Sequence, residues 1–312
     1  MFAYLVRRLW QMLPTLLGVL LLVFFLFKAF GGDPAEILGG LNATPEQVEQ
    51  IREQLGLNRP VWEQLLIFLK QIATFDWGRS WATQESVASL FATRLPATLT
   101  VMLPILILDA VLAIPLALAV AAVRGSLTDR AIMVVTTVAL SISFLVYVIV
   151  GQWLFAFRLG WFPVQGWSPD LWTNLVTYAP LPVLLAVLVG VSPQTRLYRS
   201  FFLDEIGQDY VRTARAKGLT ERAILLRHVL PNAMIPILTH IGIQLPGIFV
   251  GSFLIEVFFS IPGIGREVLL AVNRSDYPVI QAVTVYLAMI TMAVNLIVDL
   301  LYKAVDPRVV LR

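Results

Sequence analysis

The sequence predicts an all-α protein that crosses a membrane six times, and three observations support this fold class. First, its 312 residues are 58% hydrophobic and only 14% charged, whereas soluble domains are about 45–50% apolar and about 25% charged. Second, six apolar stretches approach the length of about 20 residues that a helix needs to cross the hydrocarbon core. Third, lysine and arginine favour alternate segments between these stretches, as in polytopic proteins with a fixed orientation.

The six predicted spans set the order of the chain. Several contain proline, which membrane helices tolerate when neighbouring groups bind the freed carbonyls, so we expect kinked rather than broken helices. Arg7 and Arg8 resemble the start of a signal peptide, but no Ala-x-Ala cleavage site follows the first apolar run, so we expect a retained anchor. The fourth span could extend as far as Leu197. The spans run over about Leu9–Phe30, Ala97–Val123, Ala131–Phe157, Thr177–Val191, Ala233–Phe259 and Val279–Tyr302.

The positive charges predict the orientation of these spans. With the N-terminus inside, 14 of the 23 lysine and arginine residues fall in the inner segments and 9 in the outer segments or at their edge. The inner loops are also the shorter ones, which are the loops in which positive charge sets orientation. We therefore predict that both termini are cytoplasmic, in a multi-pass membrane protein.

Two segments outside the spans are long enough to fold, and they define the predicted domains. Residues 1–30 hold the N-terminal region and the first span, and residues 31–95 form an extracytoplasmic helical subdomain. Residues 96–303 form a core with five spans and a cytoplasmic loop at 197–231. Residues 304–312 form a cytoplasmic tail.

The outer segment has a clear helix start. Thr44 is followed by Pro45 and by Gln47, the pattern of a capping box with proline at the first helical position. This helix should end at Gly56, and a second helix should run over about Pro60–Ala73. A solvated loop is the alternative, but five aromatic residues favour a packed subdomain: Trp62, Phe68, Phe75, Trp77 and Trp81.

The inner segment from Leu197 to Pro231 is predicted to form two short helices joined by a tight turn. The first should open near Asp204 with acidic residues, which the helix dipole favours, and should end at Gly218. Thr220 can cap the second, which should end at Pro231 because proline lacks an N–H group and disfavours a helical predecessor. The small residues Thr213, Ala214 and Ala216 would let a partner backbone approach closely. The pattern alone is compatible with an interfacial loop in contact with lipid or with a docking site.

The same segment resembles a known family. Residues Arg212–Gly218, followed by His228–Pro231, resemble the loop of binding-protein-dependent ABC permeases, which is Glu-Ala-Ala, three residues, Gly, nine residues and Ile-x-Leu-Pro. The spacing from Gly218 to Pro231 matches. The first two pattern residues and the isoleucine are replaced, and these departures resemble the peptide branch over Asp209–Gly218. Similar stretches extend the likeness over nearly the whole chain: Arg94–Leu99, Glu256–Gly265, Asp276–Pro278, Asp299–Lys303 and Asp306–Arg308. The chain thus resembles a permease of the dipeptide/oligopeptide/nickel ABC importer family.

The resemblance implies a role for the loop and a set of partners. It implies that the loop docks in a groove on a cytoplasmic ATPase subunit and transmits the ATP-driven closure of the ATPases. Leu230 and Pro231 would then form the hinge back into the membrane. It also implies a homologous second permease, two ABC ATPase subunits that bind ATP and magnesium, and an extracytoplasmic substrate-binding protein. This chain would hold no cofactor and catalyse no reaction, and its cargo would be a dipeptide or oligopeptide, with nickel, glutathione or another small solute as alternatives. The implied coupling residues are Asp209, Tyr210, Arg212, Thr213, Ala214, Arg215, Ala216, Lys217, Gly218, Leu230 and Pro231.

Three acidic residues lie within or at the ends of the spans, where a carboxylate is costly and suggests a function. We expect Asp299 to pair with Lys303, four residues on. Glu256 could line an outer gate or pair with Arg266, and both interpretations stay open. Asp109 lies deepest, and bonding to a neighbouring helix is favoured over lining a pathway.

Other polar residues could face a translocation pathway, although such side chains more often join helices together. The two histidines, His228 and His240, are too isolated for a metal site, there is no cysteine, and no P-loop sequence is present. An ion-coupled secondary transporter is the alternative of another class, but it should show paired acids at mid-membrane and a repeat, and we find neither. The possible pathway or gate residues are Asp109, Ser141, Ser143, Tyr147, Gln244, Ser252, Glu256 and Asn295.

Overall fold

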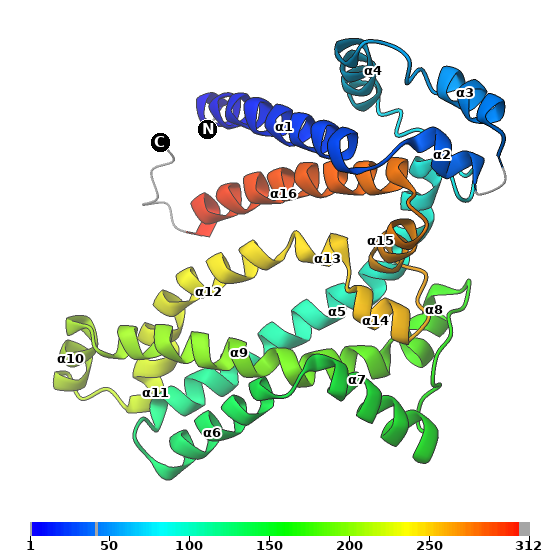
Figure 1. The fold of residues 1–312 in the computed structure, drawn as a ribbon. Coiled ribbons are helices and arrows are strands. Elements are labelled where there is room, and N and C mark those ends of the chain that lie inside the picture. Colours follow the sequence, from blue (N-terminus) through cyan, green and yellow to red (C-terminus); the bar gives the residue numbers. More distant parts are fainter. Residues whose placement is uncertain (1, 41–42, 306–312) are drawn as a thin grey trace. The chain divides into compact units, whose positions relative to one another are not determined.

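The computed structural model describes residues 2–40 and 43–305, which form a chain of helices (Figure 1). In the described residues the backbone forms no strand, only an isolated bridge between Arg79 and Ser86. Three segments are π-helical: η1 (Gln152–Arg158), η2 (Asn174–Tyr178) and η3 (Leu225–Val229). The α-helices are α1 (Phe2–Phe30), α2 (Pro34–Gly39), α3 (Pro45–Gln54), α4 (Val61–Ala73), α5 (Val87–Ala122), α6 (Leu127–Ser141), α7 (Phe144–Gly151), α8 (Leu171–Thr173), α9 (Pro180–Ile206), α10 (Asp209–Ala216), α11 (Glu221–Ile224), α12 (Leu230–Gln244), α13 (Gly247–Val250), α14 (Phe253–Phe258), α15 (Ile264–Asn273) and α16 (Tyr277–Val305).

The predicted all-α membrane fold is confirmed, and the described part of the chain holds five or six candidate spans. Five helical segments are long and apolar enough to cross a membrane, and a sixth span exists if α6 and α7 count as one. This pair bends by 87°, so the single kinked helix expected over Ala131–Phe157 is wrong. The break follows from Ile142 and Ser143, whose extended ψ angles of 129° and 137° interrupt the helix.

Two further spans differ from their expected form. The fourth continues as α9 to Ile206, because the polar-looking stretch after Val191 buries Ser192, Thr195, Tyr198 and Phe202 against its neighbours. The fifth is divided into α12, α13 and α14. Gly251 separates the last two with a φ of +76°, a conformation that favours glycine.

The chain forms two compact units, residues 1–96 with 263–312 and residues 97–262. The first boundary between the two units, after Pro96, falls inside α5. The first unit holds α1 to α4, α15 and α16, and the second holds α6 to α14. We call them unit 1 and unit 2.

In unit 1, α1 and α16 lie side by side (Figure 1). Arg8 of α1 forms an ion pair of 2.8 Å with Asp299 of α16, a contact between distant helices that the sequence interpretation missed. The expected partner, Lys303, lies outside the residues whose side chains are described. A buried cluster including Val87, Leu90 and Val279 fills the space where α5, α15 and α16 meet.

The predicted helices of the outer segment are present in unit 1. Thr44 and Gln47 form both hydrogen bonds of the capping box, at 2.9 and 3.3 Å. Neither α3 nor α4 contains a buried residue, however, and Trp62 and Phe75 are exposed, so the packed subdomain expected from the aromatic residues forms only in part. Trp77 contacts Phe91 edge-on.

In unit 2, α9 is the central helix and contacts α6, α7 and α12. Ala113, Ala117 and Ala121 recur every fourth residue of α5 and are buried in the same cluster as Tyr198 and Phe202 of α9. Small residues at this spacing let membrane helices approach closely. The result is a well-packed bundle that carries the inner segment at its end.

Candidate functional site

The inner segment forms two short helices joined by a tight turn, as predicted, at the end of α9 (Figure 1). Helix α10 ends at Ala216, and Gly218 follows with a φ of +79°. Its N–H donates to the Arg215 carbonyl at 2.9 Å, a bond that satisfies a free carbonyl at the helix end. Thr220 caps α11 as expected, since its Oγ1 accepts from the N–H of Ala223 at 3.3 Å.

The start of this site differs from the prediction. Asp204 and Glu205 belong to the last turn of α9, and α10 begins only at Asp209 after the turn at Gly207 and Gln208. The sequence shows no polar-to-apolar change that would separate these two helices. A single acidic residue, Asp209, therefore lies in the first turn of α10.

Helix α10 has one buried and one exposed face. Val211 and Ala214 are 0% and 6% exposed and pack with Ile224 and Phe202 of unit 2. Ala214 therefore contacts its own chain, and the expectation that its small side chain admits a partner is wrong. The residues left on the exposed surface are Asp209, Tyr210, Arg212, Thr213, Arg215, Ala216, Lys217 and Gly218.

Polar contacts fix α10 to both flanking helices. Arg215 donates to both carboxylate oxygens of Glu221 on α11, at 2.7 and 3.1 Å, and this bidentate contact raises the pKa of the guanidinium. Tyr210 donates to Glu205 of α9 at 2.5 Å. Burial, assisted by this hydrogen bond, raises the pKa of Tyr210 to about 12. Neither contact could be predicted from the local pattern of residues, because the partners lie in different helices.

Exposed positive charge remains on the free face of α10. Arg212 pairs only with Asp209, at 3.2 Å on an exposed surface where such pairs contribute little. Lys217 forms no ion pair with the side chains that the structure describes. The exposed face is thus polar, basic and interrupted by the small residues Thr213 and Ala216.

The predicted helix end at Pro231 is wrong. The chain stays helical through η3 and into α12, with Pro231 in the first turn of α12. The wider π-helical turn lets the N–H of Leu230 reach the carbonyl of Leu225, so proline is accommodated without ending the helix. The side chain of Asn232 donates to the carbonyl of His228 at 2.6 Å.

An ion pair between a half-buried arginine and a buried aspartate lies at the base of the inner segment. Arg199 of α9 donates to both carboxylate oxygens of Asp129 at 2.8 Å each. The N–H of Gly125 also donates to Asp129 at 2.8 Å, so the turn between α5 and α6 is tied to α9. This pair could not be predicted from the sequence, because nothing in the local pattern links residues 70 positions apart.

Asp109 lies inside unit 2, between α5 and α9. Its side chain is 9% exposed and packs on Gly190, where an added Cβ would overlap the carboxylate. Its Oδ1 has no hydrogen-bond partner among the described residues. This position between two packed helices is compatible with the favoured role in joining helices.

Glu256 is buried as well, at the start of α14. Thr98 of α5 donates to its Oε1 at 2.9 Å, and an added Cβ on Gly251 would overlap the carboxylate. Thus Glu256 holds the break in the fifth span close to α5. Its roles as a gate or as a partner of Arg266 stay predictions.

The remaining pathway candidates belong to several different helices. Ser141 and Tyr147 donate to backbone carbonyls beside the bend between α6 and α7, at 2.9 and 3.0 Å. Ser143 is the N-cap residue of α7, without a capping hydrogen bond from its side chain, and Ser252 caps α14 through the N–H of Ile255 at 3.4 Å. Asn295 is exposed on α16 of unit 1.

Gln244 belongs to a chain of polar side chains between α9 and α12. It accepts from Gln194 at 3.0 Å and contacts His240 Nδ1 at 2.9 Å, and the Tyr198 hydroxyl lies 3.4 Å from the same nitrogen. Gln194 and Tyr198, like His240 and Gln244, are four residues apart, so each pair occupies one helix face. This spacing of four residues is the sequence signal that could have predicted a polar face on each of the two helices. In the described residues no group of three metal-ligating side chains occurs.

Several apolar spans, with an exposed basic helical hairpin at the end of one bundle, define a polytopic membrane protein. The chain belongs to the family of binding-protein-dependent transport system inner membrane components. The profile of this family matches residues 113–311, and the profile of its N-terminal region matches residues 1–102.

Several relatives align over nearly the whole chain. The chain is 35% identical to a putative peptide transport system permease protein of Brucella abortus. It is 31% identical to the dipeptide transport system permease of Alkalihalophilus pseudofirmus and 33% identical to the glutathione transport system permease of Salmonella typhi. Each alignment covers 99% of this chain and 99% of the relative.

Proposed function

We propose that this chain is a transmembrane permease subunit of an ATP-driven importer, and that its cargo is a short peptide delivered by a separate binding protein. The relatives named for peptide and dipeptide transport support this cargo. Glutathione, the cargo named for another relative, is itself a small peptide, and nickel or another small solute remains an alternative. The ion-coupled transporter is disfavoured by family membership.

The observation that supports ATP coupling is the construction of the α10–α11 hairpin. Its buried face, Val211 and Ala214, packs on the bundle, and Arg215 and Tyr210 bind it to α11 and α9. A force applied to the exposed face of α10 is therefore transmitted to α9 and α12 rather than absorbed by a flexible loop. We infer that this face docks on an ATPase subunit.

The exposed face suits an acidic groove on such a partner. Arg212 and Lys217 supply positive charge, and Thr213 and Ala216 allow close backbone approach. Gly218 lets the chain turn sharply beside the surface that docks. Leu230 and Pro231 lead from the hairpin into α12, so in this proposal they relay movement as part of a continuous helix.

The proposed assembly follows from this docking. A homologous second permease completes the pore, two ABC ATPase subunits bind ATP and magnesium, and an extracytoplasmic binding protein delivers the solute. Both termini and α10 face the cytoplasm of a bacterial cell, and residues 31–95 lie outside. In this proposal residues 1–30 hold the first span, and residues 31–95 form the outer subdomain. Residues 96–303 form the core with its cytoplasmic loop, and residues 304–312 form the cytoplasmic tail.

An acidic substitution on the exposed face tests the proposal. Ala216→Glu places a negative charge where α10 would enter an acidic groove, and unfavourable charge at an interface costs several kcal/mol. We expect at least about tenfold less ATPase subunit to co-purify with the complex, together with loss of peptide uptake in proteoliposomes.

Thr128→Glu is the matched control. Thr128 is exposed in the first turn of α6, where an acidic residue is tolerated, and it lies outside the hairpin. This variant should retain the ATPase and transport. Equal retention by both variants, at equal membrane yield, would contradict the docking role.

A further inference from the structure

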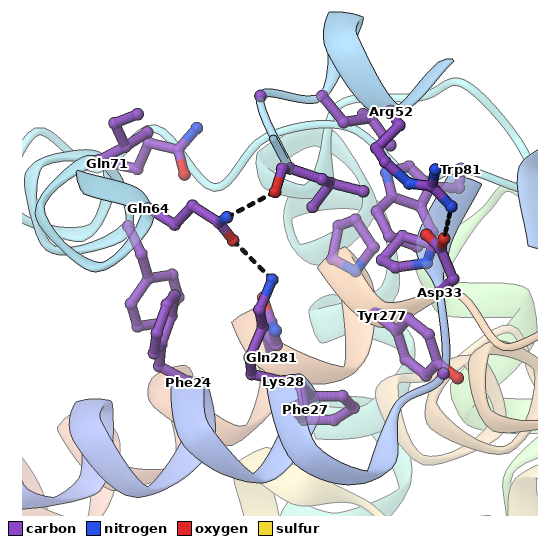
Figure 2. Close-up of a pocket in the computed structure, with 18 residues that line it drawn as sticks. Phe24, Phe27, Lys28, Asp33, Arg52, Gln64, Gln71, Trp81, Tyr277 and Gln281 are labelled. Carbon is purple, nitrogen blue, oxygen red and sulfur yellow. Dashed lines mark hydrogen bonds and ion pairs between the residues drawn. The ribbon is translucent and has the colours of Figure 1, made fainter. Parts of the chain in front are cut away.

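A cavity of about 480 Å³ lies in unit 1, at the end of α1 (Figure 2). It is bounded by the last turns of α1, by α4, by the end of α3 and by the first turn of α16. Such a volume suits a small molecule or the polar part of a larger one. Neither the transport pathway candidates nor the hairpin contribute to it.

Aromatic rings contribute much of the lining of this cavity. Phe24 of α1 lies against Phe68 of α4 with ring centroids 5.8 Å apart. Phe27 and Trp81 both contact Tyr277, with centroids 5.3 and 5.8 Å apart. Aromatic residues at the end of an apolar span are typical of the membrane–water interface, so the cavity lies at the depth of the lipid headgroups.

The charged side chains of the cavity differ in how they are compensated. Arg52 is bound by Asp33, which lines the cavity with it, and by Glu49 at 2.5 Å. Lys28 instead donates to the neutral amide of Gln64 at 3.0 Å (Figure 2). Within the described part of the chain Lys28 forms no ion pair. The Asp33 carboxylate acts on Lys28 through space but is bonded to Arg52, so the charged side chains that line the cavity leave one positive charge in excess.

The adjoining surface of α1 is apolar and open. Trp10, Leu13 and Leu17 are 73%, 58% and 47% exposed. They precede Phe24 by 14, 11 and 7 residues, so they lie on the helix face that carries Phe24 and Lys28. An occupant with an anionic group at Lys28 and a long apolar portion along α1 would satisfy both surfaces. A free anion would leave the aromatic side and this surface uncovered.

We propose that this cavity binds the headgroup of an anionic phospholipid, with its phosphate at Lys28 and its acyl chains along α1. A lysine near the membrane surface contributes about 1 kcal/mol to binding anionic lipid. The bound lipid would hold α1, α4 and the start of α16 together, where the protein itself provides few buried contacts.

The test uses the permease complex reconstituted in phosphatidylcholine vesicles containing phosphatidylglycerol. The complex is re-extracted in mild detergent, and retained phosphatidylglycerol is counted by mass spectrometry. Lys28→Gln should retain about fivefold less than the unmodified protein, and Lys28→Arg, which keeps the charge, should retain as much.

Lys70→Gln is the matched control, because Lys70 is an exposed lysine of α4 that does not line the cavity. It should leave lipid retention unchanged. Equal retention by Lys28→Gln and the unmodified protein would overturn the proposal, as would an equal loss in Lys70→Gln. Displacement of the phospholipid by the tripeptide trialanine would also overturn it, because the cavity would then be a peptide site.

Discussion

The outer segment over residues 31–95 and the inner hairpin over residues 209–230 are both short helical regions attached to membrane spans, but they are attached differently. The hairpin buries Val211, Ala214 and Ile224 in the bundle of unit 2. Helices α3 and α4 of the outer segment bury no residue, and they are held by a capping box, ion pairs and aromatic contacts. A region that transmits force needs a rigid attachment, whereas a region that receives a partner or lipid does not.

The largest effect should come from removing the buried attachment of the hairpin. Ile224→Ala deletes a fully buried side chain, and such changes cost about 2–5 kcal/mol. Hydrogen exchange of the α10 amides should accelerate accordingly. Leu66→Ala on the exposed side of α4 should change the free energy of opening, measured by hydrogen exchange in the outer segment, by less than about 0.5 kcal/mol. Similar effects at the two positions would remove the contrast between the regions.

The next effect concerns the turn after α10. Gly218 has a φ of +79°. In this conformation a residue with a Cβ has a steric clash that destabilises the fold by about 1–2 kcal/mol. Gly218→Val should therefore lower transport and loosen α10 in hydrogen exchange. Gly218→Asn should be nearly neutral, because asparagine tolerates this region. If both variants behave alike, the backbone conformation is not what matters at this turn.

A smaller effect is expected at the start of α3. Thr44→Ala removes the capping side chain that accepts from the N–H of Gln47, which costs about 1 kcal/mol of helix stability. The loss should appear as faster hydrogen exchange over Pro45–Gln54 with no change in ATPase activity. Thr44→Ser, which keeps the hydroxyl, serves as control. An effect of Thr44→Ala on ATPase activity would show that the outer segment is coupled more tightly than its packing indicates.

The smallest effect is the pH dependence of the outer segment. The hydrogen bond from Arg52 lowers the pKa of Asp33 below its ordinary value. Because this pKa is lower in the folded state than in the unfolded state, the carboxylate stabilises the folded state at pH values above the unfolded pKa of about 4. This stabilisation is lost as the pH falls through the pKa of the folded state. Exchange in α2 and α3, corrected for intrinsic rates, should thus be constant from about pH 8 to 5. Over this pH range Asp33→Asn should lower the free energy of opening by the roughly 0.2–1 kcal/mol of an exposed pair, and exchange should be faster; below the folded pKa of Asp33 the difference should vanish.

Local signals in the sequence predicted local structure well. The capping box at Thr44, the cap at Thr220 and the turn at Gly218 depend on residues within a few positions, and all three are present. The ion pairs of Asp129 with Arg199 and of Arg8 with Asp299 could not be predicted, because they depend on which helices become neighbours.

The predictions that proved wrong also concern features that the local residue pattern does not determine. Proline normally ends a helix, but the π-helical turn before Pro231 removes the conflict. A small residue in a basic helix suggested an open docking face, but only the packing of the hairpin determines that Ala214 points inward. Likewise, the bend at Ile142 and Ser143 lies in a predominantly apolar stretch whose composition predicts a single span.

Site-specific cross-linking tests the central claim, docking of α10 on an ATPase, most directly. The chain has no cysteine, so a single cysteine can carry a benzophenone maleimide without further changes. Ala216→Cys on the exposed face of α10 should cross-link to the ATPase subunit in the assembled complex, whereas Thr128→Cys and Trp62→Cys should not. Cross-linking from position 128 or 62 that equals that from position 216, or none from position 216 in a complex that retains its ATPase, would contradict the claim.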